Sequence, residues 1–92
     1  MTLRKGFADA LRIVRKHKDL TQEDFSEVSS RTYLSTLERG MKSPTLDKID
    51  DLSAVLEIHP ATLLLLAYSL SEKISVERLC DRIISEAKSF DS

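Results

Sequence analysis

The stretch TQEDFSEVSSRTYLSTLERG, residues 21–40, decides how this chain folds. It reads as two short helices with almost no connection between them, because apolar residues recur at helical spacing on both sides of a Ser-Ser pair. The apolar positions are Phe25 and Val28 in the first segment and Leu34 and Leu37 in the second. We predict one helix over about residues 22–28 and a second from residue 30 to about residue 39.

Local signals place the ends of these two helices. Thr21 suits the N-cap of the first, and the two acidic residues that follow suit its positive end. Ser29 or Ser30 can cap the second helix through its hydroxyl group. Gly40 can adopt the left-handed conformation that often ends a helix.

The rest of the chain predicts further helices, because only two Gly and two Pro interrupt 92 residues. One helix should run from Leu3 or Phe7 to Lys18. Another should start at Ser43 or Thr45, and a third should cover residues 61–70 after Pro60. A linker at residues 71–73 precedes a last helix from residue 75 or 76 to residue 89. The inner face expected for the helix after residue 45 is Leu46, Ile49, Leu52, Val55 and Leu56.

Length, charge and cysteine content limit the classes of protein. The chain is long enough for one domain with a modest core. Residues 1–48 carry 10 Lys and Arg against 7 Asp and Glu, whereas residues 49–92 carry 4 against 8. This asymmetry fits either ordinary solvated helix faces or a basic binding face. Without a long apolar run or a signal peptide, and with Cys80 as the one cysteine, we expect a reduced, cytoplasmic setting and no membrane span.

Residues 21–40, followed by KSPTLDKIDDLSAVLEI, resemble the Xre family of helix-turn-helix DNA-binding domains, the phage repressor and Cro class. The resemblance implies an all-α fold with a five-helix repressor-like domain at residues 1–70 and an added amphipathic helix at residues 71–92. The matching features are Thr21-Gln22-Glu23, the run from Arg31 to Ser35, Leu37-Glu38-Arg39-Gly40, Pro44, and the apolar helix Leu46/Ile49/Leu52/Leu56.

The family implies a recognition helix after Ser30 that enters the major groove of double-stranded DNA. By position in the family pattern, base contacts are expected from Arg31, Thr32, Thr36 and Ser30. Phosphate contacts are expected from Gln22, Ser35, Arg39, Lys42 and Ser43. The alternative is that these side chains contact no DNA and are ordinary solvated surface. Arg15 and Glu38 resemble a structural ion pair of the family.

The chain departs from the family between Gln22 and Gly40, where members usually have a longer connection that often contains glycine. We therefore predict a shortened first helix of the motif and a recognition helix that is rotated or shifted relative to the family. Serine side chains at residues 29 and 30 can supply the cap geometry that the turn needs.

The apolar segment at residues 61–70 and the last helix predict self-association, because two recognition helices related by a two-fold axis read two half-sites. The residues expected at or near a homodimer interface are Leu79, Ile83, Leu63, Leu66 and Tyr68. The last helix could instead fold back over its own core.

No pattern of an enzyme or metal site is present. His17 and His59 lie far apart, and no nucleophile elbow or glycine-rich phosphate loop occurs. We expect no cofactor and no enzymatic activity. The sequence predicts a homodimeric transcriptional regulator that binds operator DNA. The alternative is a helical protein-interaction module, antitoxin-like or an adaptor, that binds a protein partner without reading DNA.

Overall fold

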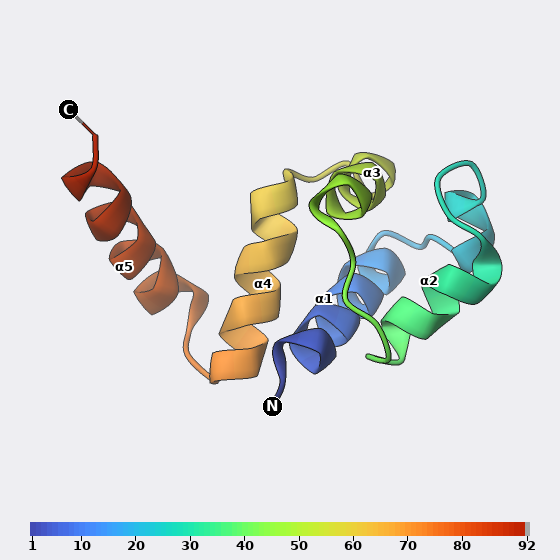
Figure 1. Cartoon of the computed structure of the whole chain (residues 1–92), viewed down its shortest axis with the longest axis horizontal. Coiled ribbons are helices and arrows are strands. Elements are labelled where there is room, and N and C mark those ends of the chain that lie inside the picture. Colours follow the sequence, from blue (N-terminus) through green and yellow to red (C-terminus); the bar gives the residue numbers. More distant parts are fainter. Residues whose placement is uncertain (92) are drawn as a thin grey trace.

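The computed structural model of the chain describes residues 1–91 and consists of five α-helices and one short 3-10 helix (Figure 1). No strand occurs within the described residues, so the predicted all-α fold is confirmed. The elements in chain order are α1 (Leu3–His17), η1 (Gln22–Phe25), α2 (Arg31–Glu38), α3 (Leu46–Leu56), α4 (Pro60–Glu72) and α5 (Val76–Ser89).

Side-chain caps set the start of every α-helix. The N-cap side chains of the five helices accept a hydrogen bond from a backbone N–H in the first turn, which satisfies a donor that the helix itself cannot pair. Thr45, and not Ser43, caps α3. His59 caps α4 because its Nδ1 accepts from the backbone N–H of Ala61 at 2.9 Å. The five caps are Thr2, Ser30, Thr45, His59 and Ser75.

The core lies where α1 packs against α4 on one side and against α2 on the other. Gly6 permits the close approach of α1 to α4, since a Cβ atom built there would lie 2.5 Å from the carbonyl oxygen of Ala67. Gly40 follows α2 with φ +71°, which confirms the predicted left-handed residue at its end. The largest fully buried apolar side chains are Leu11, Phe25, Leu34, Leu37, Leu52, Leu56 and Leu63.

Three expectations about the elements are corrected. Leu46 is 79% exposed and does not belong to the inner face of α3. It is the first helical residue after the Thr45 cap, so its side chain lies beyond the end of the buried face. The connection after α4 is residues 73–75 and not 71–73, since α4 continues to Glu72. The segment after Thr21 is helical only as far as Phe25.

The last helix, α5, lies apart from the other helices in Figure 1, and its packing partner is α4. A left-handed Lys73, with φ 58°, ends α4 and redirects the chain toward α5. Within residues 1–91, no single helix is long and apolar enough to cross a membrane. Only α3 and α4 taken together, across a bend of 105°, reach the required length and composition.

Candidate nucleic-acid interface

The candidate recognition helix α2 has one apolar side and one polar side. Leu34 and Leu37 have no exposed surface and hold α2 against the core. The Ser30 hydroxyl accepts from the backbone N–H of Tyr33 at 3.1 Å, which starts the helix directly after the turn. With its apolar side fixed, α2 presents Arg31 and Thr32 to solvent at its amino end.

The polar side of α2 shares a shallow surface hollow with the start of η1. Arg31 and Thr32, two of the expected base-contacting residues, line this hollow together with three expected phosphate-contacting residues, namely Gln22, Ser35 and Arg39. Side chains more than one helical turn apart therefore converge on one surface. This arrangement offers several hydrogen-bond donors to a single ligand along the length of α2.

The remaining expected contact residues lie outside that hollow. Ser30, Lys42 and Ser43 are exposed, at the amino end of α2 and in the loop that follows it. Thr36 is half-buried, and its Oγ1 donates to the carbonyl oxygen of Thr32 at 2.8 Å. That internal bond occupies the Thr36 hydroxyl proton and leaves its oxygen lone pairs and methyl group available to a ligand.

The turn between η1 and α2 is made without any left-handed residue. The carbonyl oxygen of Phe25 accepts from the backbone N–H groups of Val28 at 3.0 Å and Ser29 at 2.9 Å, which closes a compact turn. Ser30 is extended, with φ −69° and ψ 152°, so glycine is not required. The predicted shortening of the first helix of the motif is confirmed: it is a 3-10 helix of 4 residues. A shift of α2 relative to other family members stays a prediction.

Glu38, at the carboxyl end of α2, connects the three elements of the motif. Arg15 on α1 donates through Nε to Oε2 of Glu38 at 2.6 Å and through Nη2 to Oε1 at 2.9 Å. The Gln22 side chain on η1 donates to the same Oε1 at 3.2 Å. Side-chain exposure is only 12% for Arg15 and 6% for Glu38, so water screens this pair little. The hydrogen bond to Glu38 raises the pKa of Arg15 above its usual value.

Two contacts around Glu38 were not predicted from the sequence. Arg12 Nη1 donates to the backbone carbonyl of Glu38 at 2.8 Å, and its Nη2 donates to Asp9 Oδ1 at 2.7 Å. Arg12 thereby satisfies a carbonyl at the end of α2 that has no partner within the helix. The same Gln22 amide that was expected at phosphate lies against Glu38. The family resemblance had indicated only the pair of Arg15 and Glu38 within this network, and no local signal in the sequence indicated Arg12.

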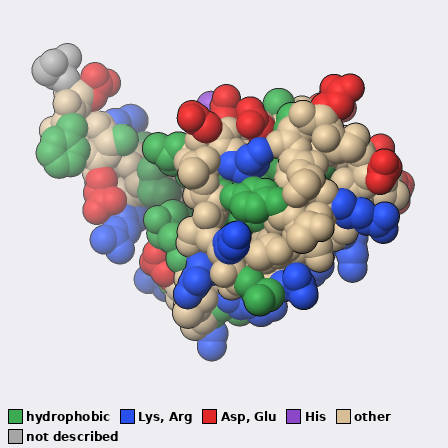
Figure 2. All heavy atoms as spheres, turned by 45° about the vertical axis from the view of Figure 1, so that its right-hand side comes forward, with side chains coloured by type: hydrophobic (Ala, Val, Ile, Leu, Met, Phe, Trp, Pro, Cys, Tyr) green, Lys and Arg blue, Asp and Glu red, His purple; other side chains and the backbone are tan. Residues whose placement is uncertain are grey.

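Charge is unevenly distributed over the surface. Figure 2 shows Lys and Arg side chains gathered on the lower part of the face drawn, and Asp and Glu along its upper edge. In Figure 1 the carboxyl end of α2 and the amino end of α1 lie at the same lower level. A basic region beside α2 is the arrangement that attracts a polyanion. Within residues 1–91, no three His, Cys, Asp or Glu side chains gather as a metal site would require.

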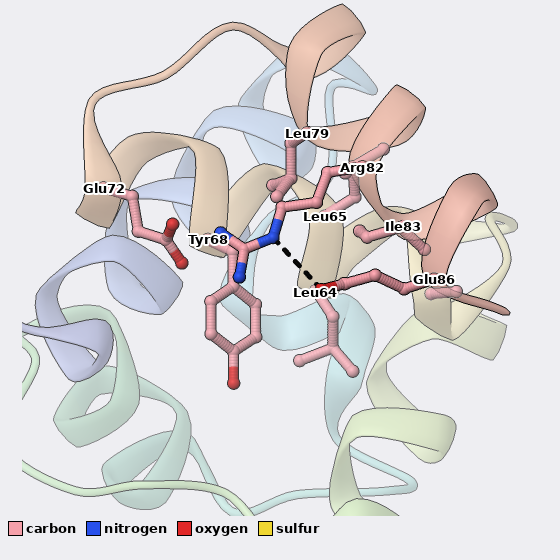
Figure 3. Close-up of a pocket in the computed structure, with 9 residues that line it drawn as sticks. Leu64, Leu65, Tyr68, Glu72, Leu79, Arg82, Ile83 and Glu86 are labelled. Atoms are coloured by element: carbon pink, nitrogen blue, oxygen red, sulfur yellow. Dashed lines mark hydrogen bonds and ion pairs between the residues drawn. The ribbon is translucent and has the colours of Figure 1, made fainter. Parts of the chain in front are cut away.

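The structure places some of the residues expected at a dimer interface in a surface groove and the others in or against the core. Tyr68 and Ile83 are 41% and 46% exposed, and they line an apolar groove of about 400 Å³ between α4 and α5 (Figure 3). Leu79 lines the same groove although it is nearly buried, and Leu66 is half-buried against the core. Leu63 has no exposed surface, so its expected place at an interface is corrected to the core of its own subunit.

Comparison with known proteins agrees with this geometry. A family model described as Helix-turn-helix, HTH_3, matches residues 11–63. The crystal structure of the clp gene regulator ClgR from C. glutamicum is 31% identical, with 75% of this chain and 92% of that chain covered and a TM-score of 0.69. The crystal structure of the hypothetical transcription factor NHTF from Neisseria is also 31% identical, with 68% and 75% covered and a TM-score of 0.62. No curated protein matches.

The family match spans more than half of the chain and includes η1, the short turn and α2. The fold that carries this match is the all-helical arrangement that the resemblance implied. The chain belongs to the helix-turn-helix family HTH_3, the Xre-like DNA-binding transcriptional regulators.

Proposed function

We propose that this protein regulates transcription by binding operator DNA sequence-specifically as a homodimer, with α2 in the major groove. The observation that carries the proposal is the division of α2 into a buried side, with Leu34 and Leu37, and an exposed side, with Arg31 and Thr32. An α-helix with its side chains is ~10–12 Å across and the major groove is ~12 Å wide, so the exposed side can reach base edges.

Specific roles follow from the chemistry of each side chain. The Arg31 guanidinium can donate two hydrogen bonds to O6 and N7 of guanine, and Thr32 can offer a hydroxyl or a methyl group to a base. Thr36 and Ser30 lie on the same helix as secondary base-contacting candidates. Phosphate contacts would come from the residues around and after α2, which are Gln22, Ser35, Arg39, Lys42 and Ser43.

The homodimer is proposed through the groove between α4 and α5. Beyond the groove itself, Ile84 is 51% exposed and Phe90 is 88% exposed, so the outer surface of α5 carries an uncovered set of large apolar side chains. Apolar patches of this kind on a small domain commonly mark a protein interface. Charges of both signs, from Glu72, Arg82 and Glu86, border the groove, which suits a self-complementary contact about a two-fold axis.

The first experiment measures DNA binding by fluorescence anisotropy with a random duplex at two salt concentrations. Each phosphate contact should lower the slope of log K against log salt concentration by about 0.9. We expect binding at low salt that weakens steeply as salt is raised. Absence of binding at low salt would remove the proposed function.

Base reading is tested by selecting bound sequences from random DNA with the wild-type protein and with Arg31→Ala. The motif recovered with Arg31→Ala should lose a guanine preference at one position of each half-site, a discrimination of ~1–3 kcal/mol. Arg78→Ala is the matched control, because Arg78 is an exposed arginine on α5. An unchanged motif for Arg31→Ala would show that the assignment of Arg31 is wrong.

The oligomeric state is tested by sedimentation equilibrium of wild type, Ile83→Ser and Ile13→Ser. Ile13 on α1 is 54% exposed, similar to Ile83 at 46%, but it lies outside the groove. We expect a dimer for wild type and Ile13→Ser and a weakened dimer for Ile83→Ser. A monomeric wild-type protein would refute the dimer.

A second candidate function is a helical protein-interaction module, and the apolar groove between α4 and α5 is the observation that favours it. A partner helix could occupy the same groove. DNA binding that depends on salt and on Arg31 supports the first function. A wild-type protein that stays monomeric and does not bind DNA supports the second.

A further inference from the structure

Lys48, on the first turn of α3, makes two contacts across the short turn of the motif. Its Nζ donates a hydrogen bond to the backbone carbonyl oxygen of Val28, which lies in the turn between η1 and α2. The same ammonium group lies 5.7 Å from the centre of the Tyr33 ring, near the amino end of α2. One side chain therefore joins α3 to the turn and to the recognition helix.

The position of Lys48 is electrostatically unfavourable unless these contacts compensate for it. Lysine in the first turn of a helix faces the positive end of the helix dipole. The carbonyl oxygen of Val28 is the complementary group, because within residues 1–91 no backbone N–H donates to it. The shortened turn leaves that oxygen without a backbone partner, since η1 has ended at Phe25 and α2 begins at Arg31.

We propose that Lys48 is a positioning residue for base reading: it fixes the angle at which α2 leaves the shortened turn. The inference rests on the proposed function of α2 in DNA binding. Tyr33 is half-buried and packs against the core, so an ammonium group over its ring restrains the amino end of α2. Arg31 lies in that same first turn of α2, so its reach depends on this restraint.

A positioning residue and a phosphate-binding residue have different effects on DNA binding. Phosphate contacts act on every sequence and contribute to the salt dependence, whereas base contacts act only on the preferred sequence. Lys42, an exposed lysine expected at phosphate, provides the contrast. Lys73, an exposed lysine after α4, provides a control for loss of one positive charge.

The experiment measures affinity for a selected duplex and for a random duplex, over a range of salt, in four variants. These are Lys48→Met, Lys48→Arg, Lys42→Met and Lys73→Met. Lys48→Met should lose about tenfold in affinity for the selected duplex, comparable with loss of one bidentate base contact. Its affinity for random DNA and its salt slope should stay close to those of Lys73→Met. Lys48→Arg, which keeps a cationic donor, should recover most of the specific affinity.

A measurement without DNA accompanies the binding assay. Hydrogen exchange at residues 28–33 should be faster in Lys48→Met than in wild type and near the wild-type rate in Lys48→Arg, because the Val28 contact restrains the turn. Thermal melting establishes that the variants are folded. If Lys48→Met is too unstable for the binding assay, Lys48→Gln takes its place. Because it removes the charge over Tyr33 but keeps a shorter donor, its affinity for the selected duplex should lie between those expected for Lys48→Met and Lys48→Arg.

Three results would overturn the role of Lys48. Equal loss of affinity for both duplexes with a shallower salt slope would make Lys48 a phosphate contact. Lower stability with an unchanged ratio of specific to random affinity would make it a purely structural residue. Unchanged hydrogen exchange in Lys48→Met would show that the turn does not depend on Lys48. By contrast, a wild-type protein that binds neither duplex would overturn the proposed function itself. In that case, faster hydrogen exchange at residues 28–33 in Lys48→Met would show that Lys48 holds the turn but has no role in base reading.

Discussion

Replacing Arg15 by Met tests whether the ion pair with Glu38 holds the motif together. The two side chains are 12% and 6% exposed and share hydrogen bonds of 2.6 and 2.9 Å, so they form a buried, bidentate pair. After the substitution the Glu38 carboxylate retains the Gln22 amide at 3.2 Å as its side-chain partner. A buried charge that loses its counter-ion costs about 3–5 kcal/mol.

Because Arg15 is partly exposed and Glu38 keeps its contact with Gln22, we expect the free energy of unfolding to fall by the lower value of this range, about 3 kcal/mol. Against a total stability of ~5–15 kcal/mol, this is a substantial fraction. For a domain of this size the melting temperature should fall by about 12–24 °C, at ~4–8 °C per kcal/mol. Thermal melting followed by circular dichroism measures the change.

A matched control uses an ion pair that is open to water. Lys5 Nζ lies 3.0 Å from Asp9 Oδ1, but the Lys5 side chain is 50% exposed. Lys5→Met should therefore cost less than about 1 kcal/mol. The double variant Arg15→Met with Glu38→Leu should be more stable than Arg15→Met alone, because it removes the unpaired carboxylate. Equal melting shifts for Arg15→Met and Lys5→Met would refute the reasoning.

Two further predictions concern the core and the response to acid. Leu52→Ala should destabilise the fold by about 2–5 kcal/mol, whereas Leu46→Ala should change stability by less than about 0.5 kcal/mol, since Leu52 is fully buried and Leu46 is 79% exposed. Urea unfolding separates these outcomes, and similar losses would contradict the orientation of α3. The hydrogen bond from Lys5, with a further one from Arg12, lowers the pKa of Asp9 below its usual value. This contribution to stability is present above that usual value, near 3.8, and is lost as pH falls through the lower pKa of the folded state. Asp9→Asn should therefore be less stable than wild type at pH 7 and approach it in acid. Asp50→Asn serves as the control, and a constant difference between Asp9→Asn and wild type at all pH values would contradict the assignment.

Local patterns in the sequence determined most of the helices. Helical spacing of apolar residues located α1, α3 and α5 to within a few residues, because each of these helices buries one continuous side. Pro60 and the apolar run that follows it located α4. Capping residues located the ends, as at Ser30 and Gly40. The exception was Leu46, which fits the spacing of the inner face but lies exposed at the first position of α3. Periodicity cannot show where along a helix the core begins.

The sequence predicted only part of the candidate site. The polar residues of α2 followed from the resemblance and from the apolar spacing of Leu34 and Leu37. The sequence did not indicate that Arg12 would reach the end of α2 or that Lys48 would contact the turn. These contacts join residues 26 and 20 positions apart, and no local rule relates such positions.

By itself the sequence determined the helices, their order and the polar side of α2, since these depend on side chains that are neighbours along one helix. Only the tertiary structure decided which side chains meet across helices. It enclosed Leu63 in its own subunit, left the groove beside Ile83 open, and added Gln22 and Arg12 to the pair of Arg15 and Glu38 that the resemblance had implied. The physical reason is that burial and hydrogen bonding between helices depend on how whole elements pack, and that packing is set by the summed shape of the core.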